Sequence, residues 1–217
     1  MSLKTMPQIE RLDEYDDPRF SGPVLAQHGA FLLDGQPCAF EIVSADTARL
    51  TAPRVLEPGE LKLLADAFRF YAGHISRFVA PDGRLLLTCP APRQFEAALD
   101  ALQPSQFYVS RRKLGAVQRF VSCGEDVVVP VQRGEGGRLV VQDGHTRLYA
   151  AHCLGAVRVR AFFPAEGPDE DVALFAREAR RRGVESISRL RLLEHDEYVR
   201  LWHGYCQRWF EEKKKQL

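Results

Sequence analysis

Residues 139–163 read LVVQDGHTRLYAAHCLGAVRVRAFF, and this stretch decides the fold. Residues 139–141 are apolar and β-branched enough to form a short strand. Leu148 and Ala151 then follow a helical spacing that stops at Gly155, a residue typical of a helix end. Valine-rich sequence follows. The stretch therefore predicts a strand, a turn, a short helix and a second strand.

The turn between the strand and the helix is Asp143-Gly144-His145-Thr146-Arg147. A helix N-terminus leaves four N–H groups unpaired and carries a partial positive charge, so it is a site for a phosphate or a carboxylate. Gly144 lets the backbone approach that anion, and Arg147 can add a forked contact. The alternative is a plain helix cap, in which Asp143 satisfies the first N–H groups and His145 and Arg147 are solvated.

This turn, followed by a helix of small residues, Leu154-Gly155 and a valine-rich strand, resembles the ParB/sulfiredoxin superfamily with its ParB-like nuclease-type domains. In that superfamily the turn binds nucleotide phosphates. The motif is most similar to that of ADP-dependent free serine kinases, which is Asp-Gly-His-His-Arg or Asp-Gly-His-Thr-Arg. The predicted order of loop, helix, strand, strand, helix and strand over residues 100–165 also matches. The resemblance implies an α+β fold with a ParB/sulfiredoxin-like mixed sheet.

The resemblance also implies roles for the residues of the turn. Gly144, His145, Thr146 and Arg147 would bind the phosphates of a nucleotide, ADP or ATP, or of a phosphorylated metabolite. Asp143 would orient the turn or help to hold Mg²⁺, and His145 would hydrogen-bond the transferred phosphoryl group. His145 and Asp143 are therefore the candidate catalytic residues, in roles that stabilise charge during phosphoryl transfer.

A second segment decides whether this chemistry takes place. In free serine kinases a glutamate in a Pro-x-Glu segment is thought to deprotonate the substrate, and this chain has Pro104-Ser105-Gln106 at that place. An amide cannot act as a general base near neutral pH. Either another carboxylate, such as Glu125 or Asp126, acts as the base in a phosphotransferase for a small hydroxyl-bearing metabolite, or the substrate loop of Ser105 and Gln106 serves a domain that only binds its ligand.

Other branches of the superfamily fit less well. Sulfiredoxins carry their reactive cysteine in a Gly-Cys-His-Arg turn, so Gly144-His145-Thr146-Arg147 argues against sulfinic acid reduction. ParB proteins bind CTP through Gly-Glu-Arg-x-Arg and then continue into a helix-turn-helix region, which the tail here lacks. The alternative function is a non-catalytic regulatory or DNA-associated ParB-like adaptor. Residues 111–113, Arg-Arg-Lys, could contact phosphates or form a solvated helix face.

The composition of the chain narrows the classes of protein to which it can belong. The chain has 217 residues, 45% of them apolar, with 30 basic and 29 acidic residues and a net charge of +1. This balance gives no long-range attraction for DNA. The five cysteines are far apart and predict buried, reduced thiols, with Cys153 facing the core. Without a signal peptide or an apolar run of about 20 residues, we expect a cytoplasmic protein with no membrane partner.

Four segments are predicted along the chain: a polar lead-in (1–25), a small α+β domain (26–91), the ParB/sulfiredoxin-like domain (92–166) and a C-terminal helical extension (167–217). The small domain should contain a β-meander over 30–33, 38–43 and 48–51 and a helix over 57–79. We also expect helices over 93–102, 111–121, 168–183 and 196–214.

The last predicted helix carries a broad aromatic face. This face either packs inside the protein or meets a protein partner or stacked bases. Its members are Tyr198, Leu201, Trp202, Tyr205, Trp209 and Phe210.

Overall fold

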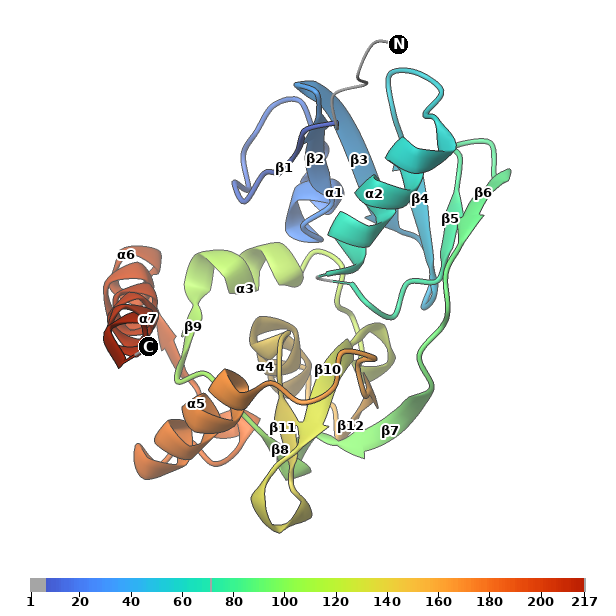
Figure 1. Ribbon diagram of the computed structural model, residues 1–217. Helices are drawn as coiled ribbons and strands as arrows, with labels where there is room; N and C mark the ends of the chain where they lie inside the picture. Colours follow the sequence, from blue (N-terminus) through green and yellow to red (C-terminus); the bar gives the residue numbers. More distant parts are fainter. Residues whose placement is uncertain (1–6, 71, 217) are drawn as a thin grey trace. The chain divides into compact units, whose positions relative to one another are not determined.

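The computed structural model describes residues 7–70 and 72–216. Its contacts divide the chain into two units, Met1–Arg93 and Gln94–Leu217, each with its own sheet and its own apolar core (Figure 1). The sequence placed a boundary near residue 91. The start of the predicted lead-in, residues 1–6, lies outside the described residues, and a later part of it forms the first strand.

The first unit is a six-stranded sheet with two helices. All neighbouring strands are antiparallel except β4 and β5, which run parallel and are joined by the crossover helix α2. In sheet order the strands are β1 (Ile9–Arg11), β2 (Ala30–Leu33), β3 (Gln36–Ile42), β4 (Thr47–Thr51), β5 (Arg77–Val79) and β6 (Leu85–Thr88), and the helices are α1 (Gly22–Ala26) and α2 (Pro58–Arg69). The predicted meander is confirmed in β2, β3 and β4.

The predicted helix over 57–79 is wrong in its second half, because α2 ends at Arg69 and residues 77–79 form β5. Both Ile75 and Phe78 are fully buried, so they kept the apolar spacing of a helix while belonging to a loop and a strand. The Arg69 side chain donates to the carbonyl oxygens of Ile75 (2.8 Å) and Gly73 (3.4 Å) and so holds this loop. Spacing alone cannot separate these cases.

The second unit is a mixed α+β unit around a five-stranded sheet of order β7-β12-β10-β11-β8. The pairs β12/β10 and β11/β8 are parallel, and the pairs β7/β12 and β10/β11 are antiparallel. The strands are β7 (Gln94–Ala98), β8 (Leu102–Gln103), β10 (Val128–Arg133), β11 (Leu139–Val141) and β12 (Arg158–Phe162), and a separate parallel pair is β9 (Tyr108–Ser110) with β13 (Arg191–Leu193).

The helices of this unit are α3 (Arg111–Val117), α4 (His145–Cys153), α5 (Glu170–Arg181), α6 (His195–Tyr198) and α7 (Gly204–Gln216), with a π-helical turn at Val199–His203 and short 3₁₀ turns at Leu99–Ala101, Gly124–Asp126, Glu135–Gly137 and Ile187–Arg189. The predicted helix over 93–102 is wrong. Its residues form β7, whose five residues pair with β12, and this pairing overrides local helix preference.

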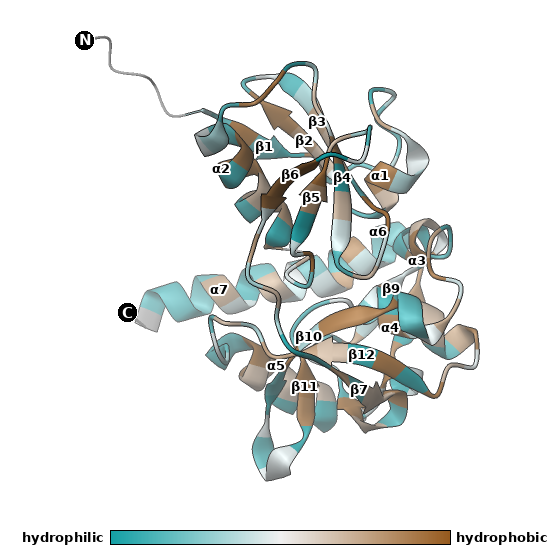
Figure 2. Cartoon of the chain, turned by 90° about the vertical axis from the view of Figure 1, so that its right-hand side faces the viewer, coloured by the Kyte–Doolittle hydropathy of each residue, from teal (hydrophilic) through white to brown (hydrophobic). Residues whose placement is uncertain are grey.

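Part of the aromatic face of the C-terminal helices packs against the rest of the unit. Trp202 and Tyr205 are partly buried and contact both Phe107 and Phe175 at ring-centroid distances of 5.0–6.0 Å, whereas Phe210 is 44% exposed. Figure 2 shows hydrophilic residues along much of α7. The expectation of buried thiols is wrong for Cys153, which is exposed near the end of α4, and for Cys123, which is also exposed.

Two further findings concern exposure. Of the other three thiols, Cys38 is buried, and Cys89 and Cys206 are partly buried. Across the described residues, the structure contains no helix that is long and apolar enough to cross a membrane.

Candidate functional site

The Asp-Gly-His-Thr-Arg turn follows β11 as the sequence predicted, but its last three residues, His145, Thr146 and Arg147, already form the first turn of α4. Gly144 adopts a left-handed backbone with φ of 89°. A Cβ atom at this position would lie 2.7 Å from Cγ1 of Val129 and 2.9 Å from Nη2 of Arg147. The turn therefore needs glycine for its conformation and for its close approach to β10.

His145 is buried, with 5% of its surface exposed, and it holds the loop that follows β8. Its Nε2 accepts a hydrogen bond of 3.0 Å from the backbone N–H of Ser105. An accepting Nε2 has no proton, so the ring is neutral with its proton on Nδ1. Burial lowers the pKa of His145 from 6.5 to about 4, so the ring stays neutral at physiological pH.

Arg147 is held on both sides of its guanidinium group. Nη1 donates to the carbonyl oxygen of Val128 (3.2 Å), and Nη2 donates to Oδ2 of Asp143 (3.3 Å). The Arg147 side chain is 17% exposed, whereas that of Asp143 is 59% exposed. Arg147 therefore fixes the turn to β10 and keeps further N–H donors on its fork.

The N-terminus of α4 has no side-chain cap among the described residues. Its first intrahelical bond runs from the N–H of Leu148 to the carbonyl oxygen of Gly144 (3.0 Å), so the N–H groups of His145, Thr146 and Arg147 precede it. The helix-cap alternative gave this task to Asp143, but that carboxylate pairs with Arg147. The helix end is left with its partial positive charge.

The predicted substrate loop lies beside the turn. The hydroxyl of Ser105 donates to the carbonyl oxygen of Val141 (2.7 Å), and the side chain of Gln106 donates to the carbonyl oxygen of Tyr108. Ser105 therefore ties the loop to the end of β11 at Val141 and to His145 of the turn, whereas the bond of Gln106 stays within the loop. The structure therefore brings together the two segments that the sequence singled out.

The other predicted residues have different surroundings. Asp126 accepts hydrogen bonds from the backbone and hydroxyl of Ser122 and from the backbone of Cys123, all within its own loop. Arg111 forms an exposed ion pair with Glu194 (2.6 Å). Within residues 7–70 and 72–216, no three His, Cys, Asp or Glu side chains gather into a group that could hold a metal ion.

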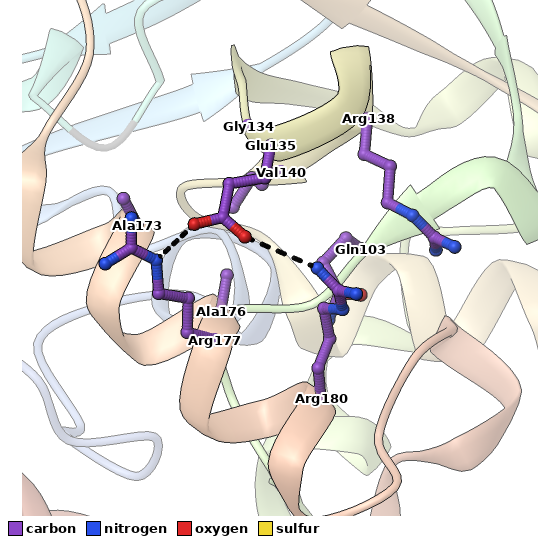
Figure 3. A pocket seen from close by; sticks show the side chains of 9 residues that line it. All are labelled: Gln103, Gly134, Glu135, Arg138, Val140, Ala173, Ala176, Arg177 and Arg180. Atoms are coloured by element: carbon purple, nitrogen blue, oxygen red, sulfur yellow. Dashed lines mark ion pairs between the residues drawn. The ribbon is translucent and has the colours of Figure 1, made fainter.

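A pocket that the sequence analysis did not predict lies in the same unit (Figure 3). It has a volume of about 40 Å³ and is lined by the β10–β11 hairpin, by α5 and by β8. Its lining residues are Gln103, Gly134, Glu135, Arg138, Val140, Ala173, Ala176, Arg177 and Arg180. The sequence signal was a pair of arginines three residues apart on a predicted helix, Arg177 and Arg180, whereas the strand that carries Gln103 was not predicted.

Comparison with known proteins adds little to this geometry. No family model matches the chain, and no curated protein matches it. One solved structure that is similar to part of the chain is protein Atu1540 from Agrobacterium tumefaciens, with 21% sequence identity and a TM-score of 0.32. The match covers 46% of this chain and 62% of that protein.

Proposed function

We propose that this protein binds a phosphate-bearing small molecule, a nucleotide or a phosphorylated metabolite, at the N-terminus of α4. The observation that carries the proposal is the uncapped helix end at His145, Thr146 and Arg147. Oriented N–H groups and the helix dipole together favour an anion at this position. The resemblance to the ParB/sulfiredoxin superfamily, whose turn binds nucleotide phosphates, supports the same ligand class.

In this proposal each side chain of the turn has a structural task. His145 is a positioning residue, because its Nε2 is occupied by the N–H of Ser105 and its ring is buried. Arg147 aligns the turn on β10 and contributes positive charge beside the helix end. Thr146 lies half-buried in the first turn of α4, so a charged residue at this position would directly change the charge at the N-terminus of the helix.

The Asp143 carboxylate would oppose a phosphate unless a cation accompanies the ligand. Mg²⁺ is commonly bound by one or two carboxylates together with substrate phosphates, and a single exposed aspartate fits that mode. We therefore include Mg²⁺ in the proposal as an ion that a nucleotide brings, with Asp143 as its protein ligand. There it would neutralise phosphate charge.

Binding without phosphotransfer is the form of the function that we favour. Gln106 occupies the place where the resemblance implies a glutamate base, and its amide donates to the carbonyl oxygen of Tyr108. An amide in this position does not accept a proton from a substrate hydroxyl. A regulatory role of a ligand-binding domain follows more directly from this loop than a kinase reaction does.

The experiment is a calorimetric titration of the full chain with ADP, ATP and CTP, each with Mg²⁺ and with EDTA. The test variant is Thr146→Glu and its matched control is Thr146→Gln. A carboxylate in the first turn stabilises a helix, so Thr146→Glu should keep or raise the melting temperature while weakening binding at least about tenfold. Thr146→Gln should bind like the wild type.

Two results would overturn the proposal. One is that no nucleotide or phosphorylated metabolite binds the wild type at millimolar concentration. The other is that Thr146→Glu and Thr146→Gln bind equally well. Incubation of the bound nucleotide with serine and related alcohols separates the two forms of the function, since phosphorylated product would restore the kinase interpretation despite Gln106.

A further inference from the structure

The pocket between the β10–β11 hairpin and α5 lies on a different face of the sheet from the core around α4. Strand pairing places Gln132 beside Val140 and Val140 beside Gln103, so these three share one face. The neighbouring Leu102 and Val141 point to the other face and belong to the core that contains Leu148 of α4. The pocket is therefore separate from the Asp-Gly-His-Thr-Arg turn.

A buried glutamine gives the pocket an unused hydrogen-bond acceptor. Gln103 is 1% exposed, and its Nε2 donates to the carbonyl oxygens of Pro104 (2.8 Å) and Val184 (3.0 Å). Because both amide protons are used, the orientation of the side chain is determined. Its Oε1 is buried and has no hydrogen-bond partner among the described residues. A buried acceptor without a partner costs free energy, so a donor is expected there.

Positive charge is in excess around the same pocket. Its lining has three guanidinium groups and one carboxylate, that of Glu135. Glu135 pairs with Nε of Arg177 (2.7 Å) and more distantly with Nη1 of Arg180 (3.8 Å), as the dashed lines of Figure 3 show. Arg138 has no ion-pair or hydrogen-bond partner for its guanidinium within the part of the chain that the structure describes.

The scaffold around these charges is well fixed. The Gln132 side chain donates to the carbonyl oxygen of Asp169 and accepts from its N–H, both at 2.9 Å, which docks the start of α5 on β10. Ala173 and Ala176 then leave room between α5 and Val140. By contrast, the ion pairs of Glu135 are exposed and contribute little free energy, so the arginines can turn to a ligand at small cost.

The volume of the pocket is sufficient for a small anion. A single water molecule needs a cavity volume on the order of 10–15 Å³, so a pocket of about 40 Å³ holds a few water molecules or one tetrahedral oxyanion. Guanidinium groups prefer phosphate and carboxylate oxygens. The acceptor Oε1 of Gln103 further requires that the ligand carries a proton. Inorganic phosphate meets all three conditions, because it keeps at least one hydroxyl at neutral pH.

We propose that this pocket is a second oxyanion site that binds inorganic phosphate, with Arg138, Arg177 and Arg180 facing its charge and Oε1 of Gln103 accepting its proton. The site is independent of the ligand proposed for α4. Sulfate has the same shape and a double negative charge but no proton at neutral pH. Sulfate would leave Oε1 unpaired, so phosphate should bind at least about tenfold more tightly than sulfate.

The test is a titration of the full chain with inorganic phosphate and with sulfate at pH 7. Binding is monitored through the NMR signals of the Gln103 side-chain amide and of the backbone of residues 135–138. Phosphate should shift these signals saturably. Arg138→Ala should weaken binding roughly tenfold, whereas Arg200→Ala, which removes another exposed arginine of the same unit, should not. Both arginines are exposed, so thermal melting should show both variants folded.

Thr146→Glu separates this site from the helix end. If the pocket binds phosphate, Thr146→Glu leaves the shifts of the Gln103 and hairpin signals unchanged. The proposal is overturned if phosphate does not move these signals, if sulfate binds as tightly as phosphate, if Arg138→Ala and Arg200→Ala behave alike, or if Thr146→Glu abolishes the shifts. The last result would assign the observed binding to α4.

Discussion

His145 shows at the scale of one residue how burial changes a chemical role. The sequence suggested a histidine that contacts a phosphoryl group, and that contact stays a prediction. The structure shows Nε2 accepting from the N–H of Ser105, with the ring buried against the loop after β8. A neutral imidazole that accepts a backbone hydrogen bond is an element of the scaffold, and its titration affects the stability of the fold.

The lowered pKa of His145 predicts a pH dependence of stability. In the unfolded chain the residue titrates near 6.5, and in the folded chain burial lowers its pKa to about 4. Between these values the unfolded state binds the proton more tightly, so stability is full above pH 6.5 and is lost as the pH falls towards 4. The loss is on the order of 3 kcal/mol. Urea unfolding of the wild type at pH 7 and pH 4.5 measures it.

The matched variant is His145→Gln, whose side-chain oxygen can still accept from the N–H of Ser105 but does not titrate. The difference in stability between pH 7 and pH 4.5 should be smaller in this variant. His203, whose pKa is also lowered by burial, and Glu178, whose pKa is lowered to about 2 by hydrogen bonds from Arg181 and Arg182, are unchanged in both proteins. An equal loss in wild type and variant would contradict the assignment to His145.

At the scale of an element, helix α4 is flanked by two glycines that both adopt a left-handed backbone but contribute differently to stability. Gly144 precedes the helix with φ of 89°, and Gly155 follows it with φ of 75°. A Cβ at Gly144 would collide with Val129 and with the guanidinium of Arg147, whereas a Cβ at Gly155 would meet nothing within 4 Å. Both substitutions strain the backbone, but only the first also displaces side chains.

We therefore expect Gly155→Ala to cost about 1 kcal/mol and Gly144→Ala to cost about 2–4 kcal/mol of unfolding free energy. Chemical denaturation of both variants gives the two values. Gly144→Ala should also weaken ligand binding at the N-terminus of α4, because the added Cβ would displace Arg147 and the turn. Equal destabilisation of the two variants would show that the contact of Gly144 with β10 is unimportant.

On the scale of the whole molecule, the residues of both proposed sites lie in the second unit, from Gln103 to Arg180. This unit has its own sheet and its own apolar core, so residues 94–217 should fold without the first unit. We expect this fragment to unfold cooperatively. Its Kd for nucleotide or phosphate should lie within about threefold of the Kd of the full chain. A fragment that is unfolded or aggregated would show that its fold depends on residues 1–93.

The sequence by itself determined the elements around residues 139–163, the α+β class, and the position of the turn between β11 and α4. These follow from local signals: apolar spacing, Gly144 and Gly155 at the two ends of α4, and the acidic start and basic end of α5. Such features depend on residues that are near one another in the chain. The resemblance also singled out Ser105 and Gln106, and the structure bonds Ser105 to His145 of that turn across 40 positions of the chain.

Only the tertiary structure decided the features that depend on distant residues. The pairing of β7 with β12 converted a predicted helix into a strand, and the loop that Arg69 holds ended α2 early. Strand register placed Gln103 opposite Val140 and thereby at the arginine-lined pocket. The physical reason is that burial, strand pairing and unpaired polar atoms are properties of neighbours in space, and periodicity along the chain does not contain them.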